Sequence, residues 1–194
     1  MHPESSEMAF ERKFQEQYSL QLSRLKPGKQ KESFELDRSF FEHFDFGLSK
    51  NGTVKADLEI HKYPGHLDVL FRLTGTVEVE CDRCLELYPQ PIDSTQRLIY
   101  SFNPDQKFDK SEVIQVQDDT APLLISQELY DYTQIALPLR RVPDRSLHIC
   151  NPDVLSVLGM DPDGNPLEFT AEPDDDDIDP RWAALKKLKD QQTD

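Results

Sequence analysis

The feature that most constrains the fold is a long alternation of apolar and polar side chains near the middle of the chain. An apolar residue stands at every second position over 54–60, and again at nearly every second position over 67–79. Successive side chains of a β-strand point to opposite faces, so this period predicts strands with one buried face. The intervening stretch "YPGH" supplies turn residues. The pattern therefore predicts a long antiparallel hairpin that covers a hydrophobic core.

Shorter patterns on both sides of this hairpin complete the expected fold. Further strands are predicted in "YSLQLSRL", "ESFELD", "STQRLIYSF" and "SEVIQVQ". One short helix is predicted in "DRSFFEHFDF", with Asp37 as its cap, and another over residues 122–135. Gly75 falls in the apolar phase of the hairpin, where a bulge or bend is expected. The sequence thus predicts an α+β fold, a mostly antiparallel β-sheet domain with a few short helices.

Composition divides the chain into four parts. Residues 1–17 are polar and are predicted to be a flexible N-terminus, and residues 18–150 form the β-rich domain. Residues 151–178 are predicted to be an acidic linker, because the stretch 153–180 holds ten carboxylates and no Lys or Arg. Residues 179–190 regain helical character, and Trp182, Leu185 and Leu188 lie on one side of the expected amphipathic helix. Such a helix is too short to be stable alone, so it is expected to dock on its own sheet or on a partner.

Charge and cysteine content favour some classes of partner and compartment over others. The net charge is −15, which disfavours non-specific binding to nucleic acid and favours basic proteins as partners. The first residues lack the apolar core of a secretory signal, and no window approaches eighteen consecutive apolar residues. Three cysteines suit a reducing compartment better than a disulfide framework. We therefore expect a cytoplasmic protein.

Two of the three cysteines stand in a C-x-x-C pair, Cys81 and Cys84, where the alternating pattern ends. A turn of this kind lets two thiolates converge on one ion, and its backbone N–H groups favour negative sulfur. Cys150 is a third candidate ligand, and His148 precedes it by two residues on the same side of an extended segment. Together these four side chains make up a Cys3His set, which suits a structural zinc ion.

Two other interpretations of the cysteines stay open. Cys81 and Cys84 are small apolar residues that suit packing in a turn at the end of a strand. They also form the spacing of a redox pair, although no thioredoxin-like βαβ pattern surrounds them. The sequence alone does not decide between structural zinc, packing and redox chemistry.

Three ordered blocks of sequence resemble the YceD-type large ribosomal RNA subunit accumulation proteins. The first is "GTVEVECDRCLELYPQPI", in which a strand runs into C-x-R-C; the second is "QIALPLRRVPDRSLHIC", and the third is "DPRWAALKKLK". The resemblance implies a non-enzymatic bacterial factor that supports large-subunit ribosomal RNA accumulation, and hence ribosome assembly. Some relatives carry further cysteines after the third cysteine, and the corresponding stretch "LGMDPDGNPLEF" has none.

The expected partner is a basic ribosomal protein or the pre-ribosomal large subunit. Arg83, Arg140 and Arg141 are candidate partner contacts, together with the apolar stripe of the C-terminal helix. The arginines suit contacts to a phosphate backbone, or they balance nearby carboxylates within the chain. No catalytic triad, glycine-rich phosphate loop or carboxylate pair indicates an enzyme. The alternative function is that of a redox-active or metal-handling C-x-x-C protein unrelated to ribosomes.

Overall fold

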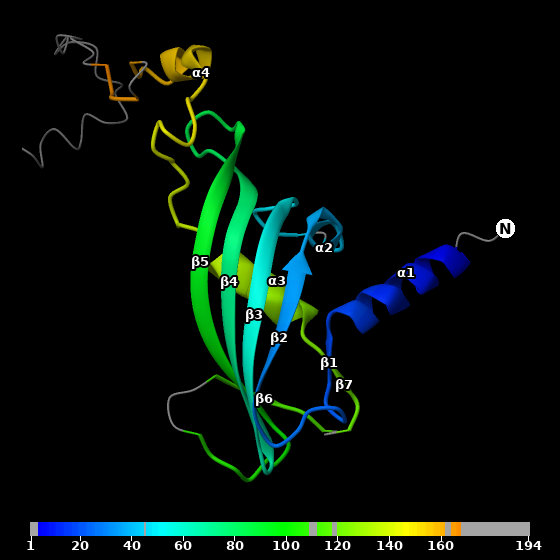
Figure 1. Ribbon diagram of the computed structural model, residues 1–194. Coiled ribbons are helices and arrows are strands. Elements are labelled where there is room, and N and C mark those ends of the chain that lie inside the picture. The colour runs from blue at the N-terminus through cyan, green and yellow to red at the C-terminus, as the bar shows by residue number, and fades with distance from the viewer. Residues whose placement is uncertain (1–3, 45, 109–111, 118–119, 162–163, 168–194) are drawn as a thin grey trace, which may run out of the picture.

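The computed structural model describes residues 4–44, 46–108, 112–117, 120–161 and 164–167. Its centre is a five-stranded sheet in the order β2-β3-β4-β5-β6, seen face-on in Figure 1. The strands are β2 (Gly28–Leu36), β3 (Gly52–Tyr63), β4 (His66–Glu80), β5 (Leu87–Ser101) and β6 (Glu112–Gln115). All neighbours are antiparallel except β5 and β6, which run parallel. The prediction of a mostly antiparallel β-sheet with a few short helices is confirmed.

The predicted hairpin is formed by β3 and β4. Their pairing runs without interruption from Gly52 opposite Val77 to Tyr63 opposite His66. The two-residue turn between them contains Gly65 with a φ of 87°, a conformation that glycine adopts without steric cost. The apolar phase of both strands is buried, as the alternation predicts. Because one face is buried throughout, the register of the hairpin is fixed.

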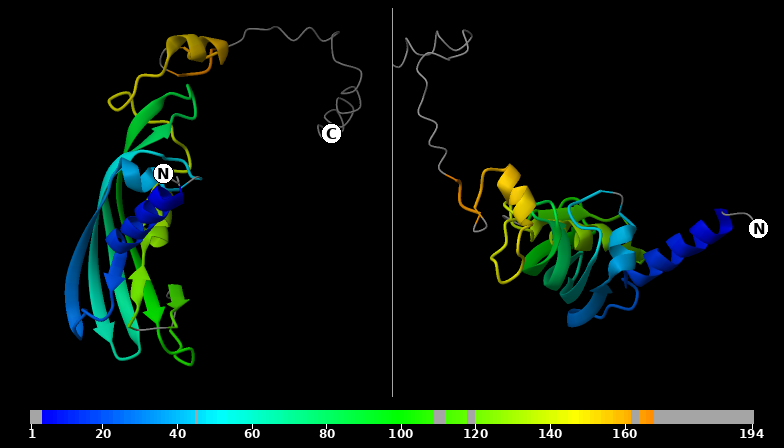
Figure 2. Two further views of the ribbon diagram at one scale, coloured as in Figure 1. Left: turned by 90° about the vertical axis from the view of Figure 1, so that its right-hand side faces the viewer. Right: turned by 90° about the horizontal axis from the view of Figure 1, so that it is seen from above.

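Two helices cover the buried face of the sheet, and the other face stays open (Figure 2). They are α2 (Arg38–Glu42), which Asp37 caps as predicted, and α3 (Ser126–Ile135). The Tyr132 ring of α3 packs edge-on against Phe71 of β4, with ring centroids 5.2 Å apart. A small second sheet, β1 (Ser19–Gln21) with β7 (Pro122–Leu124), lies beside α3. Within the described residues, no helix is both long and apolar enough to cross a bilayer.

The N-terminal segment differs from the predicted flexible stretch, because residues Glu4–Gln17 form helix α1. Phe14 anchors this helix to the domain: its ring stacks on His43 at 3.7 Å and lies 4.8 Å from that of Tyr18. Phe14 is buried, whereas Met8 and Phe10, which lie nearer the N-terminal end of the helix, are exposed. Several aromatic contacts of Phe14, including those to Phe40 and Phe44 of a distant part of the sequence, thus attach a mostly polar segment to the domain.

Two further boundaries differ from the sequence prediction. Pro122–Leu124 pair with β1 as strand β7, so the helix predicted over 122–135 begins only at Ser126. The acidic linker begins with a short helix, α4 (Pro152–Val157), whose first turn is capped by the Asn151 side chain and whose Leu155 is buried. The later part of the linker and the predicted C-terminal helix, with Trp182, Leu185 and Leu188, lie outside the described residues.

Gly75 sits in regular pairing opposite Val54, without the expected bulge. The reason for glycine here is the close approach of the neighbouring strand. A Cβ on residue 75 would lie 2.2 Å from the Thr53 carbonyl oxygen and 2.7 Å from the Val54 Cα. Both are backbone atoms of β3, so they cannot move aside by a rotamer change.

We predict that Gly75→Ala lowers the free energy of unfolding by about 3 kcal/mol, because the methyl group forces β3 and β4 apart. Thr76→Ala, the matched change at the next position, should cost less than about 1 kcal/mol. Urea unfolding followed by circular dichroism measures both variants. Equal and small losses would show that the hairpin can accept the methyl group.

Candidate metal centre

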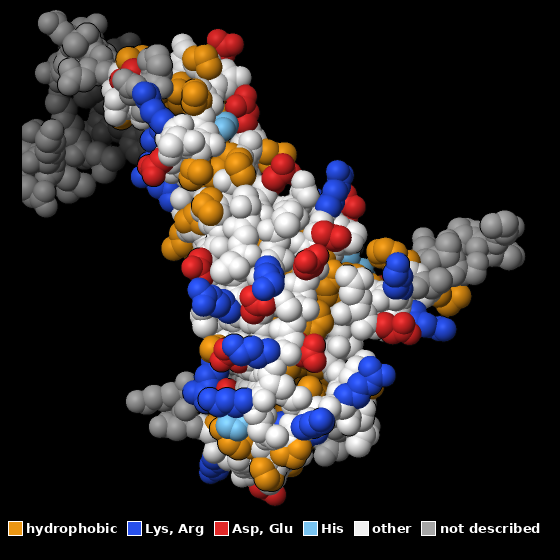
Figure 3. Space-filling model, in the orientation of Figure 1, with side chains coloured by type: hydrophobic (Ala, Val, Ile, Leu, Met, Phe, Trp, Pro, Cys, Tyr) orange, Lys and Arg blue, Asp and Glu red, His pale blue; other side chains and the backbone are white. Residues whose placement is uncertain are grey.

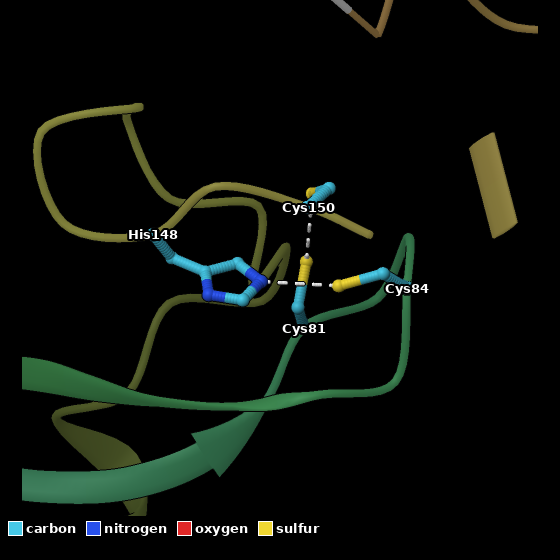
Figure 4. A group of neighbouring side chains, drawn as sticks. All are labelled: Cys81, Cys84, His148 and Cys150. Carbon is cyan, nitrogen blue, oxygen red and sulfur yellow. Dashed lines mark hydrogen bonds between the residues drawn. The ribbon is translucent and has the colours of Figure 1, made fainter. Parts of the chain in front are cut away.

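The turn between β4 and β5 holds the first two candidate ligands. Cys81 follows the last residue of β4, and its backbone N–H donates to the Glu86 carbonyl at 2.9 Å. The Leu85 N–H donates to the Cys81 carbonyl at 2.9 Å, and Leu85 itself adopts a left-handed φ of 61°. This tight turn brings the Cys84 thiol back beside that of Cys81 (Figure 4). The local sequence alone therefore builds half of the cluster.

A clamp between Asp82 and Arg141 brings in the other half. The Asp82 N–H donates to the Arg141 carbonyl at 2.9 Å, and the Arg141 N–H donates to the Asp82 carboxylate at 2.7 Å. The Arg141 guanidinium adds two bonds to the same carboxylate, at 2.6 and 3.1 Å. These bonds fasten the irregular segment after α3 to the turn, and His148 and Cys150 follow on that segment. Arg141 lowers the pKa of Asp82 through these hydrogen bonds.

The four ligand atoms converge on one point between the turn and the returning segment (Figure 4). All four lie within 4.8 Å of one another. The Cys81 and Cys150 sulfurs are 3.8 Å apart, and the Cys84 sulfur is 3.1 Å from His148 Nε2. Zn–S bonds of 2.3 Å in a tetrahedron place two sulfurs about 3.8 Å apart. The structure thus brings together all four residues of the predicted Cys3His set, close enough to bind a metal ion.

The thiols lie in a protected environment. Cys81 and Cys84 are buried, and Cys150 is half-buried. Burial by itself raises the pKa of Cys81, but hydrogen bonds from the backbone N–H groups of Cys84 and Arg83 outweigh it, and the net pKa is lowered. Burial and the neighbouring sulfurs raise the pKa of Cys150. A cation at the centre would favour the thiolate form of all three side chains.

Tyr88 and Glu86 are neighbours of His148. Its ring lies against that of the buried Tyr88, with centroids 5.8 Å apart. The Glu86 carboxylate lies 3.9 Å from His148 Nε2 and accepts a hydrogen bond from the Asn151 side chain. A carboxylate next to the ligands adds negative charge, which favours a cation.

Sequence reasoning missed Asp82, Glu86 and Tyr88, the three residues that support the ligands. Asp82 lies inside the C-x-x-C pair and so is visible in the sequence, but its partner Arg141 is 59 positions away. Only the tertiary structure shows that the two form a clamp.

The three arginines predicted as partner contacts have different surroundings in the structure. Arg141 forms an ion pair with Asp82. For this arginine the structure therefore shows the balance of a nearby carboxylate, one of the two alternatives that the sequence left open. Arg83 and Arg140 line one shallow depression beside the turn, together with Arg145. The Arg83 guanidinium lies against Gly164, where a Cβ would meet it at 2.2 Å. Partner binding by Arg83, Arg140 and Arg141 stays a prediction, as does binding by Trp182, Leu185 and Leu188.

Comparison with known proteins identifies one family. A family model described as "Large ribosomal RNA subunit accumulation protein YceD" matches residues 69–189, more than half of the chain. The matched segment contains both halves of the Cys3His cluster, the Asp82–Arg141 clamp and the acidic stretch. No curated protein and no solved structure matches the chain.

We predict that Asp82→Ala frees the segment of residues 141–150, because the Arg141 N–H and guanidinium lose their acceptor. Amide hydrogen exchange should accelerate in this segment and stay unchanged in β3 and β4. Asp93→Ala, which removes a carboxylate from β5, is the matched control and should change neither region. If exchange in 141–150 is the same in all three proteins, the clamp does not hold the segment.

Proposed function

This chain belongs to the YceD family of large ribosomal RNA subunit accumulation proteins, and from that premise we propose that it is a non-enzymatic factor in assembly of the large ribosomal subunit. The observation that carries the proposal is the family match over residues 69–189. The match extends from the central hairpin through the metal centre to the C-terminal segment. The matched range thus includes the parts of the chain with the most distinctive chemistry.

The proposed partner is a basic ribosomal protein, bound alone or on a pre-ribosomal particle. The net charge of −15 supports this choice, because it attracts Lys- and Arg-rich proteins and repels phosphate. Ten of the fifteen net charges lie in residues 153–180, where no basic side chain offsets them. A protein that holds a basic partner in this way also keeps it from binding RNA wrongly before assembly.

The proposed docking surface is the end of the domain that carries the metal centre. Apolar side chains are exposed around the cluster at Leu85, Leu87 and Ile149, where they are 71%, 62% and 79% accessible. Val157, the last residue of α4, and Leu158 after it are also exposed. Exposed apolar side chains grouped with charged ones are typical of a protein-binding surface. Trp182, Leu185 and Leu188 are proposed to join this surface as a further apolar contact.

The proposed ion at the cluster is zinc, in a structural role. Three thiolates and one imidazole make up a closed tetrahedral site of the kind that holds structural zinc. Its role would be to cross-link the turn after β4 to the segment of residues 139–151 and so to shape the docking surface. The alternative redox function is disfavoured by burial, because a reactive thiol needs access to its substrate, and Cys81 is fully buried.

We predict that the purified protein contains one zinc ion per chain and that a chelator lowers its melting temperature. His148→Gln should lose the ion, whereas His61→Gln, a matched change on the open face of β3, should keep it. Elemental analysis and thermal unfolding measure both effects. Metal-free wild-type protein whose melting is insensitive to chelator would assign the cysteines to packing.

We predict that tagged protein retains a ribosomal protein of the large subunit when the lysate has been treated with RNase. Sedimentation should place the protein in precursor fractions of the large subunit.

Trp182→Ala should clearly weaken this association and leave the melting temperature of the domain nearly unchanged. Loss of every ribosomal protein after RNase would contradict protein-mediated docking, and a large fall in melting temperature with intact association would make residue 182 part of the fold.

A further inference from the structure

The end of the sheet remote from the metal centre has a charge opposite to that of the whole chain. This end, which we call the tip surface, comprises the β3–β4 turn, the start of β2, the end of β5 and the loops next to them. Its basic residues are Arg24, Lys26, Lys29, Lys31, Lys62, Arg97 and Lys107, and its acidic residues in the described part of the chain are Glu32, Glu59, Asp68 and Asp105. Figure 3 shows Lys and Arg side chains gathered over the lower part of the open face, towards this turn.

Some of these cations are held by carboxylates, and others are available to a ligand. Arg97 forms two bonds to Asp68, at 2.8 and 2.5 Å, and Lys31 lies 2.7 Å from Glu59. Lys62 donates to two backbone carbonyls of the loop before β2. Among the described residues, no ion pair involves the side chains of Arg24, Lys26 or Lys29. The tip surface therefore has fixed cations that shape it and free cations that can meet an anion.

Aromatic rings lie among these cations. The Tyr63 ring is 4.0 Å from the ring of His61 and stacks on that of His66 at 4.7 Å, with an interplanar angle of 14°. Tyr63 is 38% exposed despite these contacts. Tyr63 and His61 line a depression of about 480 Å³ on the open face, together with Lys29 and with the ion pairs Lys31–Glu59 and Arg97–Asp68. Stackable rings and cations thus share one hollow.

We propose that the tip surface binds single-stranded RNA, with phosphates at the free lysines and arginine and with bases stacked against the His61–Tyr63–His66 rings. Surfaces that bind single strands combine a basic groove for the backbone with aromatic faces for the bases. The rings here stand on paired strands, which fixes them before binding and reduces the entropy lost on association.

The acidic charge of the chain as a whole does not prevent this binding, because ten of the fifteen net charges lie in residues 153–180, which follow the metal centre in the sequence. Strand β4 has fifteen residues between the tip surface and the metal centre. At about 3.4 Å per residue, the two ends are about 50 Å apart. Exposed charges are screened beyond about 8 Å at physiological ionic strength. The local excess of cations therefore determines what approaches the tip.

The inference adds a second partner to the proposed function and can be tested without it. Binding is measured with purified full-length protein and a fluorescein-labelled single-stranded oligoribonucleotide, by fluorescence anisotropy. Wild-type protein should bind the oligonucleotide, and Tyr63→Ala should weaken binding about tenfold. Tyr63→Phe keeps the ring and should bind like wild type. Thermal unfolding of each variant shows whether a loss of binding is a loss of fold.

The salt dependence of the same binding tests the role of the free lysines. Lys26→Gln with Lys29→Gln should reduce the slope of log K against log salt by about 1.4, which corresponds to two lost phosphate contacts on a single strand. The matched control is Lys13→Gln with Lys50→Gln, which removes the same charge away from the tip and should leave the slope unchanged.

Three results would overturn the proposal. The first is that the wild-type protein does not bind the oligonucleotide at low salt, and the second is that both double lysine variants lower the salt slope equally. The third is that polyglutamate competes as effectively as unlabelled RNA while Tyr63→Ala binds the oligonucleotide like wild type. The last result would assign the tip surface to acidic proteins. Because the assay contains no ribosomal component, failure here leaves association with a ribosomal protein intact, and failure of that association leaves RNA binding at the tip measurable.

Discussion

The pairing of β3 with β4 is the interaction on which the other features of this domain depend. It fixes which side chains of the hairpin are buried under α2 and α3, since a slip of one residue would turn the apolar phase to solvent. Its length also holds the two ends of the molecule apart. Strand β4 starts at His66, whose ring stacks on that of Tyr63, and it ends at Glu80, directly before Cys81. One element therefore positions both the tip surface and the metal centre.

The metal centre joins parts of the chain that differ in how they are ordered. The turn around Cys81 and Cys84 is shaped by its own backbone hydrogen bonds, whereas the segment that carries His148 and Cys150 contains little regular structure. The Asp82–Arg141 clamp joins the second half to the first. A bound ion would add a second cross-link at the same place, and it would couple the shape of the proposed docking surface to metal content.

The distribution of charge supports two kinds of partner. Most of the net negative charge follows the metal centre in the sequence, and the free cations gather at the opposite end of the sheet. If each end binds as proposed, a basic protein and a single RNA strand are held on one rigid sheet about 50 Å apart. A factor that supports accumulation of ribosomal RNA benefits from such an arrangement, because it brings a protein to its RNA without competing for the same surface.

The sequence by itself determined the hairpin, the α+β class and the identity of the four candidate ligands, because each depends on local periodicity or spacing. Alternation marked the buried face of β3 and β4, and the C-x-x-C pair marked the turn after them. The tertiary structure decided what depends on distant contacts. Phe14 of the N-terminal helix stacks on His43, and Arg141 reaches Asp82 from 59 positions away. The cations of the tip surface come from four separate stretches of the chain. The net charge of the chain therefore does not reveal them as a group, and they become neighbours only in the folded structure.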